Sequence, residues 1–387
     1  MIKELNIEHD YREIFDLSQF AFQYQLSETD LDKKRKEARR HIIWGYMDGD
    51  TTAAKLHLIP LSCYIGGKAF KMGGISSVAT WPEYRRKGIV KELLAHALKY
   101  MKENGQTISY LHPFSVPFYR KFGWEIAFNE KSYTIPMEKL KKNWDGHGYV
   151  RRMSPDYNIL NQIYSEYAKA YTGMLVRDEK WWEQRVLKDS MHIAVAYNEE
   201  ETPEGYIIFE VKDKVFSVVE MVNRSLNGLR LLTQFIANHD SMVQKVEMIA
   251  PENDTLPLLI EDPRFEQKIE PYFMVRIVNV FEFLKHYPFA AANHSVSLHI
   301  QDDFLSENNG TYEIKRTEVD SNVTCTRADN RSVKRVSCSI QHLTTLFFGY
   351  KRPMELFNLG LIHGPKEEIE KLEEIIPKQQ PFFADFF

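Results

Sequence analysis

A short cationic turn is the most informative chemical feature of the chain. The stretch 85–88, R-R-K-G, joins an extended run over 71–80 to a long amphipathic segment over 90–102. Backbone N–H groups at the start of a helix have no partner within the helix and carry partial positive charge, so they attract anions. Glycine leaves room where an anion would approach most closely. The spacing therefore predicts a turn that binds a phosphate or diphosphate group.

The elements around this turn are predicted by the periodicity of apolar residues. Helical material is expected over 9–26, and S-E-T-D at 27–30 offers a cap for a second helix. Turn-forming D-G-D and G-G sequences separate three strands, expected over 42–47, 52–65 and 69–80. The segment after the turn is predicted as a helix that ends at Asn104-Gly105. The unit closes with a strand over 107–111, a short helix around 117–119 and a strand over 124–136.

The junction resembles motif A of the GNAT acyltransferase superfamily, R/Q-x-x-G-x-G/A between a strand and a helix, with valine in place of the last small residue. The resemblance implies that backbone amides of the turn hold the pyrophosphate of acetyl-CoA and that the preceding strand splays to pair with the pantetheine arm. The alternative is a helix start whose basic residues face solvent. The implied cofactor-binding residues are Val78, Ala79, Thr80, Arg85, Arg86, Lys87, Gly88, Ile89, Val90, Lys91, Phe114 and Ser115.

A second unit repeats the order of the first. Helices are expected over 156–171, 178–187 and 225–239, and strands over 191–197, 205–212, 215–222 and 245–250. Its strand-to-helix junction over 222–228, V-N-R-S-L-N-G, lacks the basic glycine turn. We therefore expect a degenerate GNAT-like domain without cofactor rather than an active one.

A third unit contains the hairpin turn N-N-G at 308–310 and the run S-I-Q-H-L-T-T-L-F-F-G at 339–349. With these features it resembles a sterol-carrier-protein-like domain. Its strands are expected near 295–300, 310–315, 323–327 and 334–339, and its helices near 340–347 and 365–375. The predicted fold class is α/β (α+β) with three domains. These are a catalytic GNAT domain with the acetyl-CoA site over 1–145, a degenerate GNAT-like domain over 146–284, and a sterol-carrier-protein-like domain over 285–387 whose C-terminus enters the active site.

The order of the three modules resembles the Eis family of bacterial acetyltransferases, together with P-F-Y-R-K-F-G-W at 117–124 and M-V-R-I-V-N-V at 274–280. The resemblance implies acetylation of amines, including aminoglycosides, and assembly as hexamers. It also implies that Tyr119 is the general acid for the departing thiolate. A phenol with a pKa of about 10 can protonate a thiolate whose thiol has a pKa near 8.5 at a cost of roughly 2 kcal/mol. The alternative is that Tyr119 packs in the core beside Phe118 and Phe122.

The resemblance gives the general base as the α-carboxylate of Phe387, delivered from the third domain. The tail P-F-F-A-D-F-F over 381–387 is rich in phenylalanine, which is typical of a buried end. Burial would raise the pKa of the carboxylate and strengthen it as a base. The alternative role, a hydrophobic anchor for the third domain, is compatible with this one. Candidate linings of the amine site are the carboxylates Glu28, Asp30 and Asp385, the rings Phe20, Phe22 and Tyr24, and the pair Trp181-Trp182.

Composition narrows the function further. A formal net charge of −4 and a pI near 6.4 argue against a nucleic-acid binder. The partner that the resemblance implies is a small-molecule amine. Three widely spaced cysteines form neither a disulfide framework nor a metal-site pattern, so no metal is expected. We find no signal peptide and no membrane-spanning run, and predict a cytoplasmic protein. Two alternatives remain: a lipid carrier with GNAT scaffold domains, and a GNAT enzyme for protein lysines or small polyamines.

Overall fold

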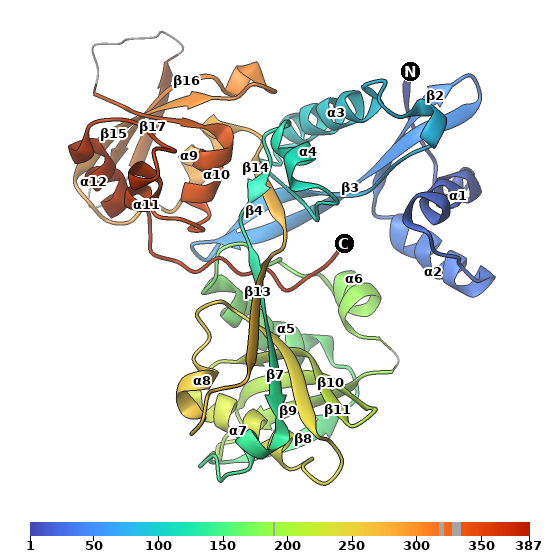
Figure 1. Cartoon of the computed structure of the whole chain (residues 1–387), viewed down its shortest axis with the longest axis vertical. Helices are drawn as coiled ribbons and strands as arrows, with labels where there is room; N and C mark the ends of the chain where they lie inside the picture. The colour runs from blue at the N-terminus through green and yellow to red at the C-terminus, as the bar shows by residue number, and fades with distance from the viewer. Residues whose placement is uncertain (189, 317–320, 327–333) are drawn as a thin grey trace.

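The computed structural model describes residues 1–188, 190–316, 321–326 and 334–387, which form three β-sheets with helices packed on them. Figure 1 shows the first sheet at the upper right, the second below it and the third at the upper left. The fold confirms two GNAT-type units followed by a third α/β unit.

The first sheet carries the candidate site. Its spatial order is β1 (Ile2–Glu4), β2 (Ile42–Asp48), β3 (Thr51–Ile65), β4 (Lys68–Thr80), β5 (Ile108–Leu111), β14 (Met274–Ile277) and β6 (Glu125–Ile126). The helices of this unit are α1 (Tyr11–Phe22), α2 (Glu28–Ala38), α3 (Ile89–Glu103) and α4 (Val116–Arg120). The predicted cap of α2 is confirmed, because Ser27 Oγ accepts a hydrogen bond from the N–H of Asp30 at 3.1 Å. The predicted amphipathic face of α3 is also confirmed, since Leu93, Leu94, Ala97 and Leu98 are fully buried.

The second sheet has the spatial order β13 (Glu266–Pro271), β7 (Asn129–Pro136), β12 (Lys245–Ala250), β11 (Val215–Asn223), β10 (Pro203–Lys212), β9 (His192–Tyr197) and β8 (Tyr149–Met153). Its helices are α5 (Tyr157–Lys169), α6 (Glu179–Trp181), α7 (Leu226–Ala237) and α8 (Leu256–Leu259). The prediction of an α-helix over 178–187 is correct only for the first turn, which is α6. The residues that follow, Trp182–Val186, form a π-helical turn instead. Trp181 and Trp182 are buried, which favours their interpretation as core residues.

The first two units exchange strands, which the sequence did not reveal. The single strand expected over 124–136 is two strands in different sheets, because β6 stays in the first sheet while β7 pairs with β12 and β13 in the second. In return, β14 pairs with both β5 and β6. Every residue of β14 is buried, as expected for a strand inserted into the middle of a sheet.

The third sheet has the spatial order β17 (Ser321–Thr326), β16 (Gly310–Arg316), β15 (His294–Gln301) and β18 (Val336–Ser339). Its helices are α9 (Val280–His286), α10 (Ile340–Phe347), α11 (Pro353–Asn358) and α12 (Lys366–Ile375). The strand predicted over 323–327 reaches residue 326, and residue 327 lies outside the described residues. Helices α9 and α11 were not predicted.

The C-terminal tail leaves the third unit and runs between the first two (Figure 1). Pro381 forms a β-bridge with Thr172, and the N–H of Phe382 donates to the carbonyl of Thr172 at 3.0 Å. Phe382, Phe383 and Phe387 are buried. The tail is therefore an integral part of the core rather than a frayed end.

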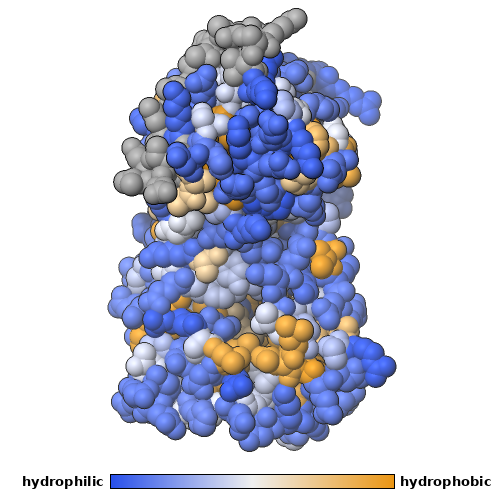
Figure 2. Space-filling view, turned by 90° about the vertical axis from the view of Figure 1, so that its left-hand side faces the viewer, coloured by the Kyte–Doolittle hydropathy of each residue, from blue (hydrophilic) through white to orange (hydrophobic). Residues whose placement is uncertain are grey.

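The face shown in Figure 2 is mainly hydrophilic, with a group of apolar side chains over the lower half, where the second unit lies. Exposed apolar side chains of this unit include Leu258 in α8 and Ile269 in β13. Within the described part of the chain, no helix combines the length and the apolar character that crossing a bilayer requires.

Candidate active site

The first sheet opens beside the predicted phosphate-binding turn. Strand β4 pairs with β5 in parallel only as far as Ile75 and Leu111, although β4 continues to Thr80. The register between β3 and β4 shifts in this region, and Ser77 lies in the left-handed region with φ 51°. The edge of β4 from Ser76 to Thr80 is thus left without a partner strand on the β5 side, as the resemblance implied for the pantetheine arm.

The turn before α3 has the geometry of an anion site. Gly88 lies at the helix start with φ 81°, and no side chain caps the helix. The first hydrogen bond of the helix runs from the N–H of Glu92 to the carbonyl of Gly88 at 3.2 Å, so the preceding N–H groups remain available. A Cβ atom at Gly88 would meet nothing within 4 Å. The backbone and the open space therefore fit a diphosphate.

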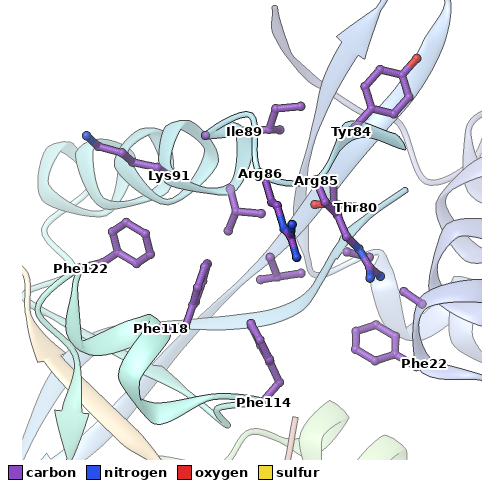
Figure 3. A pocket seen from close by; sticks show the side chains of 15 residues that line it. Phe22, Thr80, Tyr84, Arg85, Arg86, Ile89, Lys91, Phe114, Phe118 and Phe122 are labelled. Atoms are coloured by element: carbon purple, nitrogen blue, oxygen red, sulfur yellow. The ribbon is translucent and has the colours of Figure 1, made fainter. Parts of the chain in front are cut away.

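A cavity of about 600 Å³ lies beside this turn. Figure 3 shows Arg85 and Arg86 reaching toward it, with Phe22, Phe114 and Phe118 around it. Ten of the predicted cofactor-binding residues line the cavity: Val78, Ala79, Thr80, Arg85, Arg86, Gly88, Ile89, Val90, Lys91 and Phe114. The hydroxyl of Thr80 is buried and has no partner among the described residues, which leaves it available to a ligand.

Two predicted cofactor-binding residues lie outside this cavity. The Lys87 ammonium lies over the ring of Tyr84, 5.0 Å from its centroid. Ser115 precedes α4, and its carbonyl accepts a hydrogen bond from the N–H of Tyr119 at 3.3 Å. Conversely, Phe118 and Phe122 line the cavity and were not predicted. Their place in the P-F-Y-R-K-F-G-W motif was the available signal.

A second cavity of about 440 Å³ adjoins the first and shares Phe22, Val78 and Phe114 with it. Tyr119 and Phe387 both line this second cavity, which we call the acceptor cavity. The family resemblance implied that these two residues, 268 positions apart in the chain, act as acid and base. The structure brings them to one space.

Tyr119 is held by a turn that the second and third units support. The Arg276 side chain of β14 donates to the carbonyl of Phe122, and a Cβ atom at Gly123 would collide with it. The same fully buried guanidinium donates to Asp302 Oδ2 at 2.5 Å. Glycine is therefore required in this turn, which has φ 86°. Burial raises the pKa of the Tyr119 phenol, so it keeps its proton at neutral pH.

Phe387 is fixed by its own ring and by Asp385. Its ring packs directly on β4, since a Cβ atom at Gly74 would lie 2.7 Å from a ring carbon. Asp385 accepts hydrogen bonds from Arg177 Nε at 3.0 Å and from the indole N–H of Trp181 at 2.7 Å. The prediction that Asp385 is available to the amine is therefore wrong, because this buried carboxylate is paired with Arg177, which it shares with Glu220, and does not line the acceptor cavity.

The other expected carboxylates are also absent from the acceptor cavity. Glu28 and Asp30 lie exposed in the first turn of α2 and line neither cavity. The carboxylate side chain that does line the acceptor cavity is Glu37, and it is paired with Arg185. Of the expected walls, Phe22 and Tyr24 line the cavity and Phe20 does not. Residues of this cavity that sequence reasoning missed include Lys34, His41, His57, Ser77, His112 and Arg185.

The corresponding junction of the second unit is closed by its own side chains. The N–H of Gly228 donates to Ser225 Oγ at 2.9 Å, so helix α7 is capped. The Glu204 carboxylate accepts from Ser225 and from Asn227, which places a negative charge where a phosphate would bind in the first unit. This geometry favours the interpretation of the second unit as degenerate.

Comparison with known proteins agrees with this architecture. Acetyltransferase (GNAT) domain models match residues 2–127 and 173–277, and a sterol carrier protein domain model matches residues 280–384. The chain thus consists of two GNAT acetyltransferase domains followed by a sterol carrier protein domain. Acetyl-CoA is the acetyl donor of such acetyltransferases, as the sequence predicted.

The chain is also similar to individual proteins over much of its length. An uncharacterized N-acetyltransferase of Streptomyces griseus is 22% identical over 62% of this chain and 64% of its own length. The N-acetyltransferase Eis of Mycobacterium bovis is 23% identical over 54% of this chain and 55% of its own. The chain therefore matches less than two thirds of the length of these curated relatives. The resemblance is confirmed: this is an Eis-like protein of the GNAT superfamily.

Solved structures support the fold over the whole chain. A probable N-acyltransferase of Enterococcus faecalis V583 is 27% identical with a TM-score of 0.93, and the match covers 100% of this chain and 99% of that one. The structure of Eis1 from Mycobacterium abscessus is 19% identical with a TM-score of 0.82, and the match covers both chains completely. The latter likeness establishes the fold alone.

Proposed function

We propose that the protein transfers an acetyl group from acetyl-CoA directly to a primary amine. The observation that carries the proposal is the pair of adjoining cavities. One of them begins at an uncapped helix with two arginines, and the other contains both Tyr119 and the terminal residue Phe387. Bound acetyl-CoA would supply the activated acetyl thioester at the junction between the two.

Tyr119 is proposed as the general acid. A departing thiolate needs a proton, and the buried phenol holds one at neutral pH because burial raises the pKa of Tyr119. The phenol comes from a motif whose neighbouring glycine is locked by Arg276, so its position is fixed by packing. Proton donation from this side chain needs no metal ion.

The α-carboxylate of Phe387 is proposed as the general base that accepts a proton from the attacking amine. Phe387 is only 6% exposed, and Phe273, Trp181 and Phe383 surround its ring. A carboxylate among such rings is poorly hydrated, which strengthens it as a base. Asp385, two residues earlier, is held by Arg177 and Trp181, and these contacts limit how far the tail extends into the cavity.

Aminoglycosides and other polyamines are the first substrates to test, because the family resemblance implies that such amines are acetylated. Protein lysines are the other class. A substrate with several amino groups would not meet a matching number of carboxylates in the acceptor cavity. Among the described lining residues the one side-chain carboxylate is Glu37, and it is paired with Arg185. The terminal carboxylate is thus the main anion available to a single ammonium group.

The experiment is release of CoA thiol from acetyl-CoA across a panel of spermidine, kanamycin, lysine and a lysine-containing peptide. Tyr119→Phe should lower kcat roughly 100-fold or more with little change in acetyl-CoA affinity. Tyr100→Phe, whose ring packs on Trp44 outside both cavities, is the matched control. Equal kcat values for the two variants would refute the acid role.

The base is tested by adding residues after Phe387. The extension removes the carboxylate from its place and should abolish turnover, while the same residues added before Met1 should leave turnover unchanged. Full activity of the C-terminally extended chain would exclude this base. No thiol release by the wild-type protein with any amine of the panel would refute the transferase itself.

We further propose that the protein is a cytoplasmic homo-oligomer, with a hexamer as the assembly suggested by the resemblance. Supporting observations are the free buried thiols of Cys63 and Cys338 and the exposed apolar side chains of the second unit. Every residue of edge strand β13 is exposed, which also suits a contact between copies. Native mass spectrometry would decide between a monomer and a hexamer.

A further inference from the structure

A row of basic side chains lies along the acceptor cavity and has no role in the mechanism described so far. Lys55 of β3 is fully buried, and among the described residues no carboxylate is paired with it. A buried ammonium without a counter-ion is costly, so proteins rarely keep one without a use. His57 and His41, which line the cavity, connect Lys55 to it.

The hydrogen bonds around Lys55 can be assigned. Ser18 Oγ donates to the carbonyl of Ile14 at 3.2 Å, so it accepts from Ser77 Oγ, which lies 3.2 Å away. Ser77 Oγ must then accept from Lys55 Nζ at 2.7 Å, and the Ser77 carbonyl accepts from it at 3.1 Å. Two of the amine protons are thus committed to Ser77. The third position of Nζ faces His57 Nε2 at 3.1 Å.

This third contact satisfies Lys55 in either protonation state. A charged Lys55 donates its third proton to His57 Nε2, whereas a neutral Lys55 accepts the Nε2 proton with its lone pair. The next contact has the same property, because His57 Nδ1 and His41 Nδ1 lie 3.2 Å apart and share one proton. The remaining nitrogen of His41, Nε2, is left for a ligand in the cavity. One shared proton lies between His41 and His57, and the other lies between His57 and Lys55. When both protons shift to the other partner of their contact, the net effect is the transfer of one proton between the cavity and Lys55.

The electrostatic environment determines which of the three side chains, His41, His57 or Lys55, changes its protonation state near neutral pH. Burial, with a smaller contribution from Lys34, lowers the pKa of Lys55 to about 7. Burial also lowers the pKa of His57 well below its ordinary value, and that of His41 to about 3. The charged groups that act on the two rings are Lys34, Arg40, Lys55 and Arg185, and Glu37 neutralises the last of these. Both imidazoles are therefore neutral near pH 7, and Lys55 is the group that titrates there.

We propose that His41, His57 and Lys55 form a proton relay that takes the first proton from the ammonium group of an amine bound in the acceptor cavity. The ammonium gives a proton to His41 Nε2, His41 gives its Nδ1 proton to His57 Nδ1, and His57 gives its Nε2 proton to Lys55. The amine becomes a neutral nucleophile and Lys55 becomes an ammonium. After product release the proton returns by the same route to solvent.

Such a relay would remove the proton that an ammonium group must lose before it can attack, which the terminal carboxylate does not do. This inference rests on the proposed function. An alkylammonium group with a pKa of about 10.4 is neutral in only about one molecule in 2,500 at pH 7. The carboxylate of Phe387 accepts the proton released during attack, so a separate acceptor is required for the proton that must leave before attack.

The test is the pH profile of kcat/KM for Lys55→Met and Lys55→Arg, with the amine of the panel that the wild-type protein acetylates fastest. Both variants should lose roughly 10- to 100-fold at pH 7, and the loss should shrink to less than about 3-fold at pH 10, where about a third of the amine arrives already neutral. Coenzyme A affinity and melting temperature, measured for each variant, verify that the site is intact.

The arginine variant distinguishes a proton-relay role of Lys55 from a purely structural role, in which Lys55 only holds Ser77 of β4 in place. Arginine keeps the donors toward Ser77 but does not lose its proton. Wild-type activity of Lys55→Arg at pH 7, or an equal loss at every pH in Lys55→Met, would overturn the relay.

A second measurement does not depend on turnover. The Lys55 Nζ resonance in the wild-type protein, assigned by its loss in Lys55→Met, should titrate near pH 7. A midpoint above pH 9 would overturn the relay even if the protein acetylates amines. A midpoint near 7 in a protein inactive on the whole panel would instead refute the proposed function.

Discussion

The buried pair Arg276–Asp302 joins the catalytic turn to the third unit, and replacing Asp302 by asparagine tests that joint. Asp302 Oδ1 accepts from the N–H groups of Phe304 and Leu305 at 3.0 and 2.9 Å, and an asparagine carbonyl can retain both bonds. Oδ2 accepts from Arg276 and, at 2.9 Å, from Asn308. The asparagine amide would face both of these donors with N–H groups, leaving a buried guanidinium uncompensated.

Breaking a buried ion pair by removing one partner costs about 3–5 kcal/mol. For a cooperative unit of about 200 residues this corresponds to a fall in Tm of roughly 6–20 °C. The assay is thermal unfolding followed by circular dichroism. Asp303→Asn is the matched control, because this neighbouring carboxylate is exposed and should shift Tm by less than about 2 °C. Equal Tm values for the two variants would show that the pair does not hold the units together.

Four shorter predictions follow from the same contacts. Gly88→Ala should weaken coenzyme A binding roughly ten-fold by calorimetry, because a side chain would occupy the anion site at φ 81°. Gly74→Ala should displace the ring of Phe387 and lower kcat while leaving coenzyme A affinity unchanged; an unchanged kcat would contradict the placement of the tail. Asp385→Asn should likewise lower kcat, since it weakens a charge-assisted bond from Arg177 worth about 1.5–3 kcal/mol. The Tm of the wild type relative to Lys55→Met should rise from pH 7 to pH 10. The unfolded lysine binds a proton up to pH 10.5 and the folded one only to about 7, so the penalty of burial disappears as pH rises; a flat difference would contradict it.

The phosphate end of the site could be predicted from the sequence because it is local. The strand, the glycine turn and helix α3 are consecutive, and Gly88 with Arg85 and Arg86 lies where the periodicity placed it. Tyr119 and Phe387 were reached through the family resemblance. Spacing alone could not bring together residues so far apart in the chain.

The acceptor end could not be predicted because its contacts are between distant segments. Asp385 is paired with Arg177, which lies 208 residues earlier in the chain. Strand β14 lies between β5 and β6 in the first sheet, although the strands of the second sheet, from β7 to β13, separate it from them along the chain. The alternation of Lys55 and His57 on β3 marks one face of a strand, but only the contacts with Ser77, which lines the cavity, show that Lys55 lies next to it.

Calorimetric titration of coenzyme A into the folded protein at moderate salt tests the central claim most directly. We expect binding at one site per chain that weakens as salt rises, and that weakens roughly ten-fold or more in the Arg85→Gln, Arg86→Gln double variant. The matched control is Lys99→Gln, on the exposed face of α3. Absence of heat from the folded wild-type protein would contradict a diphosphate site at the turn before α3.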